Sequence, residues 1–159
     1  MPKMRKRIIA RPLHSPAREQ DWLDLESTAS VEVTSEDSAF PIESALLQHG
    51  KEGWRAAEAG VQTIRLIFDQ PRRLRRIAVV FEETETQRTQ EFTLRWSSDQ
   101  GSSFRDIVRQ QWNFSSPDAT RETEEYNVDL PNVTLLELII DPDKGNGKAR
   151  ASLLSLRLA

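Results

Sequence analysis

The sequence of 159 residues contains no cysteine and only two histidines, His14 and His49. Without cysteine, disulfide bonds, thiol catalysis and cysteine-based zinc sites are excluded. Two histidines cannot form a histidine-rich metal site, and they argue against a catalytic histidine. We therefore expect neither a bound metal nor a cofactor.

The sequence also lacks an excess of one charge and long apolar runs. The net charge is -3, and charges of both signs are mixed along the chain, so nothing indicates general attraction to nucleic acid. The basic start, Met1–Arg7, precedes only three apolar residues, Ile8–Ala10, whereas a secretory signal needs roughly 7–15. We expect a cytoplasmic protein without a signal peptide or a transmembrane span.

Residues 1–20 show no sustained apolar period. We expect them to form a mobile basic arm, with residues 21–159 forming a single domain. A plain disordered leader is the favoured interpretation of this arm, and contact with an anionic partner is the alternative.

Apolar residues then recur at every second position, which predicts short strands. Turn residues separate most of the runs, for example Asp69–Pro71, Ser98–Gly101 and Asp141–Gly147. Pro41–Gln48 predicts at most one short helix, and no long helix separates the strands, which excludes parallel βαβ units. The pattern indicates an all-β fold, either a sandwich or a closed sheet, with eight strands near Val31–Thr34, Ile64–Phe68, Ile77–Phe81, Phe92–Trp96, Phe104–Val108, Tyr126–Leu130, Leu135–Ile140 and Leu154–Leu158.

The order and spacing of motifs from Ala29 to Ala159 resemble the galactose-binding-like jelly roll of discoidin and coagulation-factor C-type domains. The resemblance depends on a succession of short motifs, among them Gly53-Trp54-Arg55, Gln62–Asp69, Phe92–Asp99 and Ala151–Leu153. It implies an eight-stranded antiparallel jelly-roll β-sandwich, in which Trp54 is a core residue. The chain departs from many members of the superfamily because it lacks a terminal cysteine pair and an obvious acidic calcium loop.

The resemblance implies a non-catalytic binding module whose partner is a carbohydrate, a phospholipid head group or a protein. We consider a carbohydrate first and an intracellular protein partner second. A third alternative is a nucleic-acid-repair domain like the N-terminal domain of a single-strand-break repair scaffold. Arg72, Arg73, Arg75 and Arg76, which we expect on one hairpin, would serve that third function, although solvated side chains are the favoured interpretation.

Antiparallel strands place their connections alternately at two ends of a sandwich. One end should collect the long connections 35–61, 82–90, 111–124 and 141–149, and binding residues concentrate on such loops. The predicted ligand-binding residues at this end are Trp112, Asn113, Arg88, Arg55 and Glu43.

Each of these residues also has a structural interpretation. Trp112 either stacks on a ligand or closes the end of the core, with equal weight. For Arg55 we favour an ion pair with Glu36, Asp37 or Glu43, and for Arg88 a solvated pair with Glu82, Glu83 or Glu85. Asp141, Asp143 and Asn146 lack the spacing of a calcium loop and indicate a turn.

Known catalytic motifs are absent from the sequence, including G-x-S-x-G, the phosphate loop and the dinucleotide fingerprint. A pair of carboxylates could act on a glycoside only across a cleft, and short loops offer little room for one. We therefore expect no enzymatic activity.

Overall fold

The computed structural model describes residues 22–47, 52–145 and 147–159. The predicted arm, residues 1–20, and Asn146 lie outside these ranges. The elements, in chain order, are α1 (Leu25–Thr28), β1 (Ala29–Val33), α2 (Glu43–Leu46), β2 (Trp54–Ala59), β3 (Gln62–Glu82), β4 (Arg88–Ser97), β5 (Arg105–Phe114), β6 (Arg121–Asp141), β7 (Arg150–Leu153) and β8 (Ser155–Leu158).

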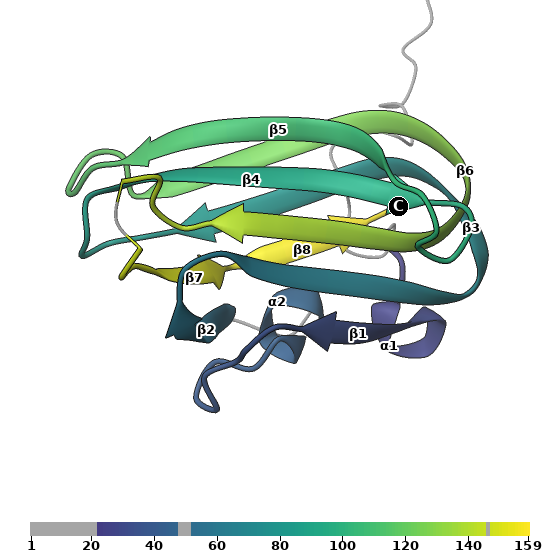
Figure 1. Cartoon of the computed structure of the whole chain (residues 1–159), viewed down its shortest axis with the longest axis horizontal. Coiled ribbons are helices and arrows are strands. Elements are labelled where there is room, and N and C mark those ends of the chain that lie inside the picture. The colour runs from purple at the N-terminus through teal and green to yellow at the C-terminus, as the bar shows by residue number, and fades with distance from the viewer. Residues whose placement is uncertain (1–21, 48–51, 146) are drawn as a thin grey trace, which may run out of the picture.

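The strands form a two-layered antiparallel sandwich, in agreement with the predicted jelly roll (Figure 1). One layer has the order β1-β3-β6-β4-β5, and β8 pairs with the second half of β3 in the other layer. A separate two-stranded sheet joins β2 to β7. Neither four-residue helix is long enough to cross a membrane, and no other helix in the described residues is.

β3 and β6 each contribute to both layers because they bend together. Gln62–Ile67 pairs with Leu135–Ile140 in one layer, and Arg76–Glu82 pairs with Arg121–Asn127 in the other. Three shifts of register between Ile67 and Arg76 absorb the bend. Figure 1 shows the two strands curving together at one end of the sandwich.

This bend corrects the prediction of a turn at Asp69–Pro71 and of an arginine hairpin beside it. The chain stays extended through Pro71, where a missing N–H falls among the register shifts and therefore breaks no regular ladder. Two of the four arginines carry ion pairs, Arg73 with Asp129 and Arg76 with Glu125. Four of the predicted strands are therefore halves of two long ones. Ile64–Phe68 and Ile77–Phe81 belong to β3, and Tyr126–Leu130 and Leu135–Ile140 belong to β6.

β2 and α1 were not predicted, and Ala151–Leu153, expected to open the last strand, belongs to a separate strand, β7. β2 and β7 are short, and the alanines of β2 give little strand signal. The expectation of at most one short helix holds for α2 but misses α1, a single turn whose N-terminus is capped by the Asp24 carboxylate.

The core lies between the layers and follows the predicted alternation. Ile64, Leu66 and Phe68 of β3 face inward and are buried, as are Phe92, Leu94 and Trp96 of β4. Trp54 is 1% exposed, which confirms it as a core residue, and its indole Nε1 donates to the main-chain oxygen of Ser35 at 3.0 Å. The chain after β1 is therefore anchored to the core at Ser35.

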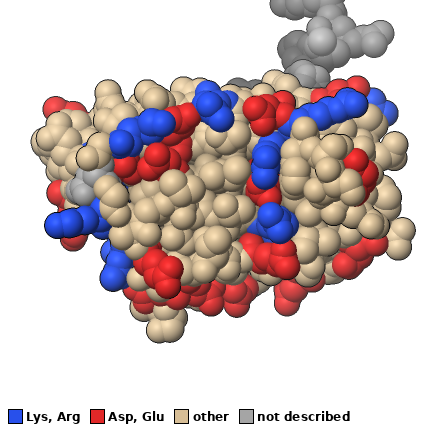
Figure 2. Space-filling model, viewed as in Figure 1, with Lys and Arg blue, Asp and Glu red and all other residues tan. Residues whose placement is uncertain are grey.

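The outer face of the five-stranded layer carries a row of alternating charges. Glu32, Arg65, Glu137 and Arg95 are successive cross-strand neighbours on β1, β3, β6 and β4. Glu137 is buried and accepts from both arginines, from Arg65 Nη2 at 2.8 Å and from Arg95 Nε at 2.6 Å. Figure 2 shows acidic and basic side chains alternating in a column across this face.

Gly53 gives a test of how tightly β2 packs on β7. Its φ is +73°, and a Cβ there would collide with the main-chain oxygen of Leu153 and approach Leu154 Cα to 2.8 Å. We expect Gly53→Ala to lower the free energy of unfolding by roughly 3 kcal/mol or more, measured by urea denaturation.

Gly60→Ala is the matched control for this substitution. Gly60 also has a positive φ, +91°, but its Cβ would meet nothing within 4 Å. It should cost only the backbone strain, about 1 kcal/mol. Equal losses in the two variants would show that the β2–β7 contact adds nothing.

Candidate functional site

The long connections meet at the end of the sandwich opposite the β3–β6 bend, as the topology predicts (Figure 1). Main-chain hydrogen bonds join them: Glu83 N donates to Thr120 O at 2.8 Å, and Lys144 N donates to Thr89 O at 2.8 Å. This end therefore forms one continuous surface rather than separate loops.

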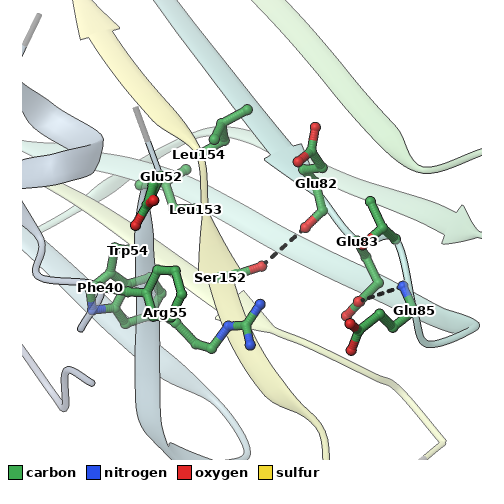
Figure 3. Close-up of a pocket in the computed structure, with 11 residues that line it drawn as sticks. Phe40, Glu52, Trp54, Arg55, Glu82, Glu83, Glu85, Ser152, Leu153 and Leu154 are labelled. Carbon is green, nitrogen blue, oxygen red and sulfur yellow. Dashed lines mark hydrogen bonds between the residues drawn. The ribbon is translucent and has the colours of Figure 1, made fainter. Parts of the chain in front are cut away.

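A cleft opens at this end between the β2–β7 sheet and the loop that joins β3 to β4 (Figure 3). One wall carries Phe40, Glu52 and Arg55, and the floor includes Trp54 and Ser152. The opposite wall is the 82–85 segment, with its three glutamates, Glu82, Glu83 and Glu85.

Arg55 supplies the hydrogen-bond donors of the first wall. It is exposed, and its guanidinium carbon lies 5.0 Å from the centroid of the Phe40 ring, a cation–π contact. Figure 3 shows Arg55 reaching across the cleft toward the carboxylates of Glu83 and Glu85. The exposed guanidinium can therefore donate to a ligand from a fixed position.

The favoured ion pair of Arg55 was wrong. Among the described residues Arg55 pairs with none of the three predicted partners. The carboxylates of Glu36 and Asp37 accept from the main-chain N–H groups of Ile42 and Ala39.

Glu83 supplies acceptors on the second wall. Its carboxylate accepts from Arg88 Nε at 2.8 Å and from the main-chain N–H groups of Glu85 and Thr86 at 3.3 and 3.4 Å. Burial by itself raises the pKa of Glu83, but these hydrogen bonds and the Arg88 charge outweigh burial and lower it below its usual value. Glu83 is therefore an ionised, fixed acceptor at neutral pH.

Arg88 holds this wall from behind. It is 4% exposed and donates also to Gln90 Oε1 at 3.0 Å and Pro142 O at 2.8 Å, while its guanidinium lies 4.7 Å from the Phe114 ring centroid. The predicted glutamate partner is correct, but the prediction of a solvated pair is wrong, because the pair is buried. A buried position suits a supporting residue, and direct contact between Arg88 and a ligand stays a prediction.

The other predicted site residues lie outside the cleft. Trp112 is half-buried against the core, and Asn113, on the opposite face of β5, is exposed and accepts from Thr89 Oγ1 at 2.8 Å. Glu43 is exposed at the start of α2, beside a separate apolar hollow. Their roles in binding stay predictions.

Phe40, Glu52 and Ser152 were not predicted from the sequence, because its apolar pattern did not reveal β2 and β7 as the strands that position them. A weak signal was present: Trp54 and Ala56 are buried on either side of exposed Arg55, the alternation of a strand. Asp143 lies in a turn, where it accepts from the N–H groups of Thr89 and Gly145. Within the described residues no group of three His, Asp or Glu side chains converges as a metal site would require.

A buried acid lies behind the cleft wall. Glu122 is 0% exposed, its Oε1 accepts from Gln90 Nε2 at 3.4 Å, and its Oε2 has no hydrogen-bond partner among the described residues. Burial, together with the charge of Glu124, raises the pKa of Glu122 to about 7. Glu122 therefore holds a proton well into the neutral range.

Comparison with known structures decides the fold. The module named CBM32 of AlyQ, in complex with 4,5-unsaturated mannuronic acid, has a TM-score of 0.60 to this chain at 15% identity, covering 82% of this chain and 93% of that one. A family 32 CBM from C. perfringens NanJ, in complex with galactose, has a TM-score of 0.55 at 16% identity over 82% and 92% of the two chains. CBM32-3 from a family 31 glycoside hydrolase of Clostridium perfringens has a TM-score of 0.59 at 17% identity over 87% and 94%. The chain has the galactose-binding-like jelly-roll fold.

Comparisons at the level of sequence add nothing further. No family model matches the chain, and no curated protein matches it either. The galactose-binding-like fold is therefore established by the arrangement of strands, while the identity of any ligand has to be argued from the cleft.

The buried position of Arg88 leads to a stability prediction. Arg88→Met keeps the aliphatic stem but leaves Glu83 without its charged partner, so we expect a loss of about 3 kcal/mol in the free energy of unfolding, measured by urea denaturation. Arg121→Met is the matched control, since Arg121 forms an exposed pair with Glu82 and should cost about 0.5 kcal/mol or less. A loss for Arg88→Met as small as that of the control would contradict the role of Arg88.

The raised pKa of Glu122 predicts how stability depends on pH. Between pH 4.5, the ordinary pKa, and about pH 7 the folded chain keeps a proton that the unfolded chain releases. Because the folded state then binds more protons, the free energy of unfolding falls as pH rises through this range, by on the order of 3 kcal/mol. Glu122→Gln should remove this fall, so its stability relative to wild type should grow from pH 4.5 to 7 and then level off in urea titrations. If the difference in the free energy of unfolding between wild type and Glu122→Gln does not depend on pH, the raised pKa of Glu122 is refuted.

Proposed function

We propose that this chain is a non-catalytic carbohydrate-binding module whose ligand occupies the cleft between Arg55 and the 83–87 loop. The observation that carries the proposal is the pairing of a donor wall with an acceptor wall in one cleft. A sugar hydroxyl both donates and accepts hydrogen bonds, so one ring can satisfy Arg55 on one side and Glu83 or Glu85 on the other.

The structural neighbours support this assignment, because two of them are modules in complex with sugars, galactose in one case and an unsaturated mannuronic acid in the other. The position of the cleft supports it too. It lies at the loop end of a rigid sandwich, where loops can vary without disturbing the core.

The charges of the cleft favour a neutral sugar over an acidic one. Glu82 and Glu83 are paired with Arg121 and Arg88, but Glu52 and Glu85 also line the cleft, where Arg55 is the single cation among the described lining residues. A uronate carboxylate would meet this negative charge. We infer that neutral sugars such as galactose are preferred.

The same charges argue against glycoside hydrolysis. A general acid needs a raised pKa so that it carries a proton at neutral pH. Among the carboxyl groups of the cleft, Glu83 has a lowered pKa instead. The acid whose pKa is raised, Glu122, is fully buried and does not line the cleft.

Substitution of Arg55 tests the proposal. Against a panel of neutral, amino and acidic sugars, we expect wild type to bind neutral sugars best and Arg55→Ala to weaken that binding about 10-fold or more, measured by titration calorimetry. The reason is the loss of a charged donor, which contributes roughly 1.5–3 kcal/mol.

Arg73→Ala is the control, because Arg73 is also an exposed arginine but lies at the bend, paired with Asp129. It should bind like wild type. Unchanged binding by Arg55→Ala, or no binding to any sugar by the wild type, would contradict the proposal.

A second candidate function is a protein-interaction module. An apolar hollow beside α1, β1 and α2 favours it, with Leu25, Leu46 and Leu66 in its lining and Glu26 and Glu43 at its edge. This function would use Glu43 rather than Arg55, and it gains weight if the sugar panel is negative.

A further inference from the structure

The candidate cleft is connected to the interior by a chain of hydrogen bonds. Arg88 Nε donates to Glu83 in the cleft wall, Arg88 Nη1 donates to Gln90 Oε1 at 3.0 Å, and Gln90 Nε2 donates to Glu122 Oε1 at 3.4 Å. Four side chains on the β3–β4 loop, β4 and β6 therefore link a partly exposed acceptor to a fully buried acid.

The surroundings of Glu122 leave its charge poorly compensated. On β6, Glu124 and Tyr126 lie on the same inward face, two and four residues on. On β4, Arg88 is the one cation that acts on Glu122 among the described residues. From β3 its cross-strand neighbour is Phe81, which carries no charge. On β5 the uncharged Trp112 lies opposite Gln90, the hydrogen-bond partner of Glu122.

Unsatisfied polar atoms on this inward face support the same conclusion. Glu122 Oε2, Tyr126 Oη and Trp112 Nε1 are buried and have no hydrogen-bond partner in the described part of the chain. Burial, Glu124 and Glu122 together raise the pKa of Tyr126 to about 12, so both acidic groups favour the neutral form. An ionised Glu122 carboxylate would therefore attract the guanidinium of Arg88, the available cation.

We propose that Glu122 is a positioning residue for the cleft, whose proton determines whether Arg88 acts on Glu83 alone or is shared with the interior. The proposal deepens the proposed function, on which its consequence for sugar binding rests. With the proton present, Arg88 holds Glu83 in the wall. With the proton lost, the negative charge of Glu122 competes with Glu83 for Arg88, and the acceptor wall loosens.

The direction of the pH effect follows from this competition. Glu83 keeps its charge between pH 5.5 and 8.5, since its pKa is below its usual value, and arginine side chains are not deprotonated in proteins. Glu122, with a pKa of about 7, changes charge within that interval. The wall should be well ordered at pH 5.5 and looser at pH 8.5.

The first experiment needs no ligand. NMR of the whole chain from pH 5.5 to 8.5 would follow the Arg88 Nε–Hε signal and the main-chain amides of Glu85 and Thr86, which donate to Glu83. We expect all three signals to shift together with a midpoint near pH 7 in wild type. In Glu122→Gln they should stay at their low-pH positions throughout.

Glu124→Gln is the matched control, because Glu124 lies on the same face of β6 but is half-buried and not in the hydrogen-bonded chain. It should keep the transition and move its midpoint to lower pH, since the Glu124 charge helps to raise the pKa of Glu122. A purely structural role for Glu122 would give no coordinated shift. Signals that do not move with pH in wild type, or that move equally in Glu122→Gln, overturn the proposal.

Calorimetry with galactose then separates this proposal from the proposed function. We expect wild type to bind galactose about 5-fold more tightly at pH 5.5 than at pH 8.5, the lower end of usual coupling between sites, and Glu122→Gln to bind equally at both. Binding that is independent of pH in wild type overturns the control of the cleft by Glu122. If galactose does not bind but the NMR transition is observed, the result counts against the carbohydrate function and supports the coupling of Glu122 to Glu83.

Discussion

β3 and β6 pair with each other through both layers of the sandwich, and this shared path fixes the positions of the remaining strands. Because the two strands bend together, they lie side by side as hydrogen-bonded neighbours twice, once in each layer. β1 and β4 add to one half of the pair and β8 to the other. Leu74 and Val133 fill the inside of the bend and are 0% exposed, so the layers are joined by packed side chains as well as by the chain itself.

Much of this fold is predictable from the sequence because its strands alternate so regularly. The alternation determines which face of a strand is buried, since a shift by one residue would expose all of its apolar side chains. This holds for Ile64, Leu66 and Phe68 of β3 and for Phe92, Leu94 and Trp96 of β4. What alternation cannot specify is whether a strand ends or bends. Proline and aspartate at 69–71 favour a turn locally, but the pairing partner, which is about 65 residues away along the chain, keeps the segment extended.

The candidate site was less predictable, for a related reason. Arg55 was identified, but its wall depends on Phe40 and on the pairing of β2 with β7, contacts between segments almost 100 residues apart. Arg88 was identified as well, although its burial follows from its contacts with Phe114 and Pro142, which lie far from it in the sequence. For Trp112 the sequence pattern favoured stacking on a ligand and closing the end of the core equally. In the structure its side chain is half-buried against the core, and its role in binding stays a prediction.

The ion pair of Glu83 with Arg88 also divides the β3–β4 loop into an exposed tip and two fixed ends. The four residues between them, Thr84–Gln87, are all exposed, while the two ends of the loop are held together by a buried ion pair at 2.8 Å. A loop whose ends are fixed in this way can change in length and composition at its tip without transmitting strain to the strands on either side. The scaffold is thus suited to diversification: libraries confined to residues 84–87 would vary one wall of the cleft while the rest of the domain folds as before.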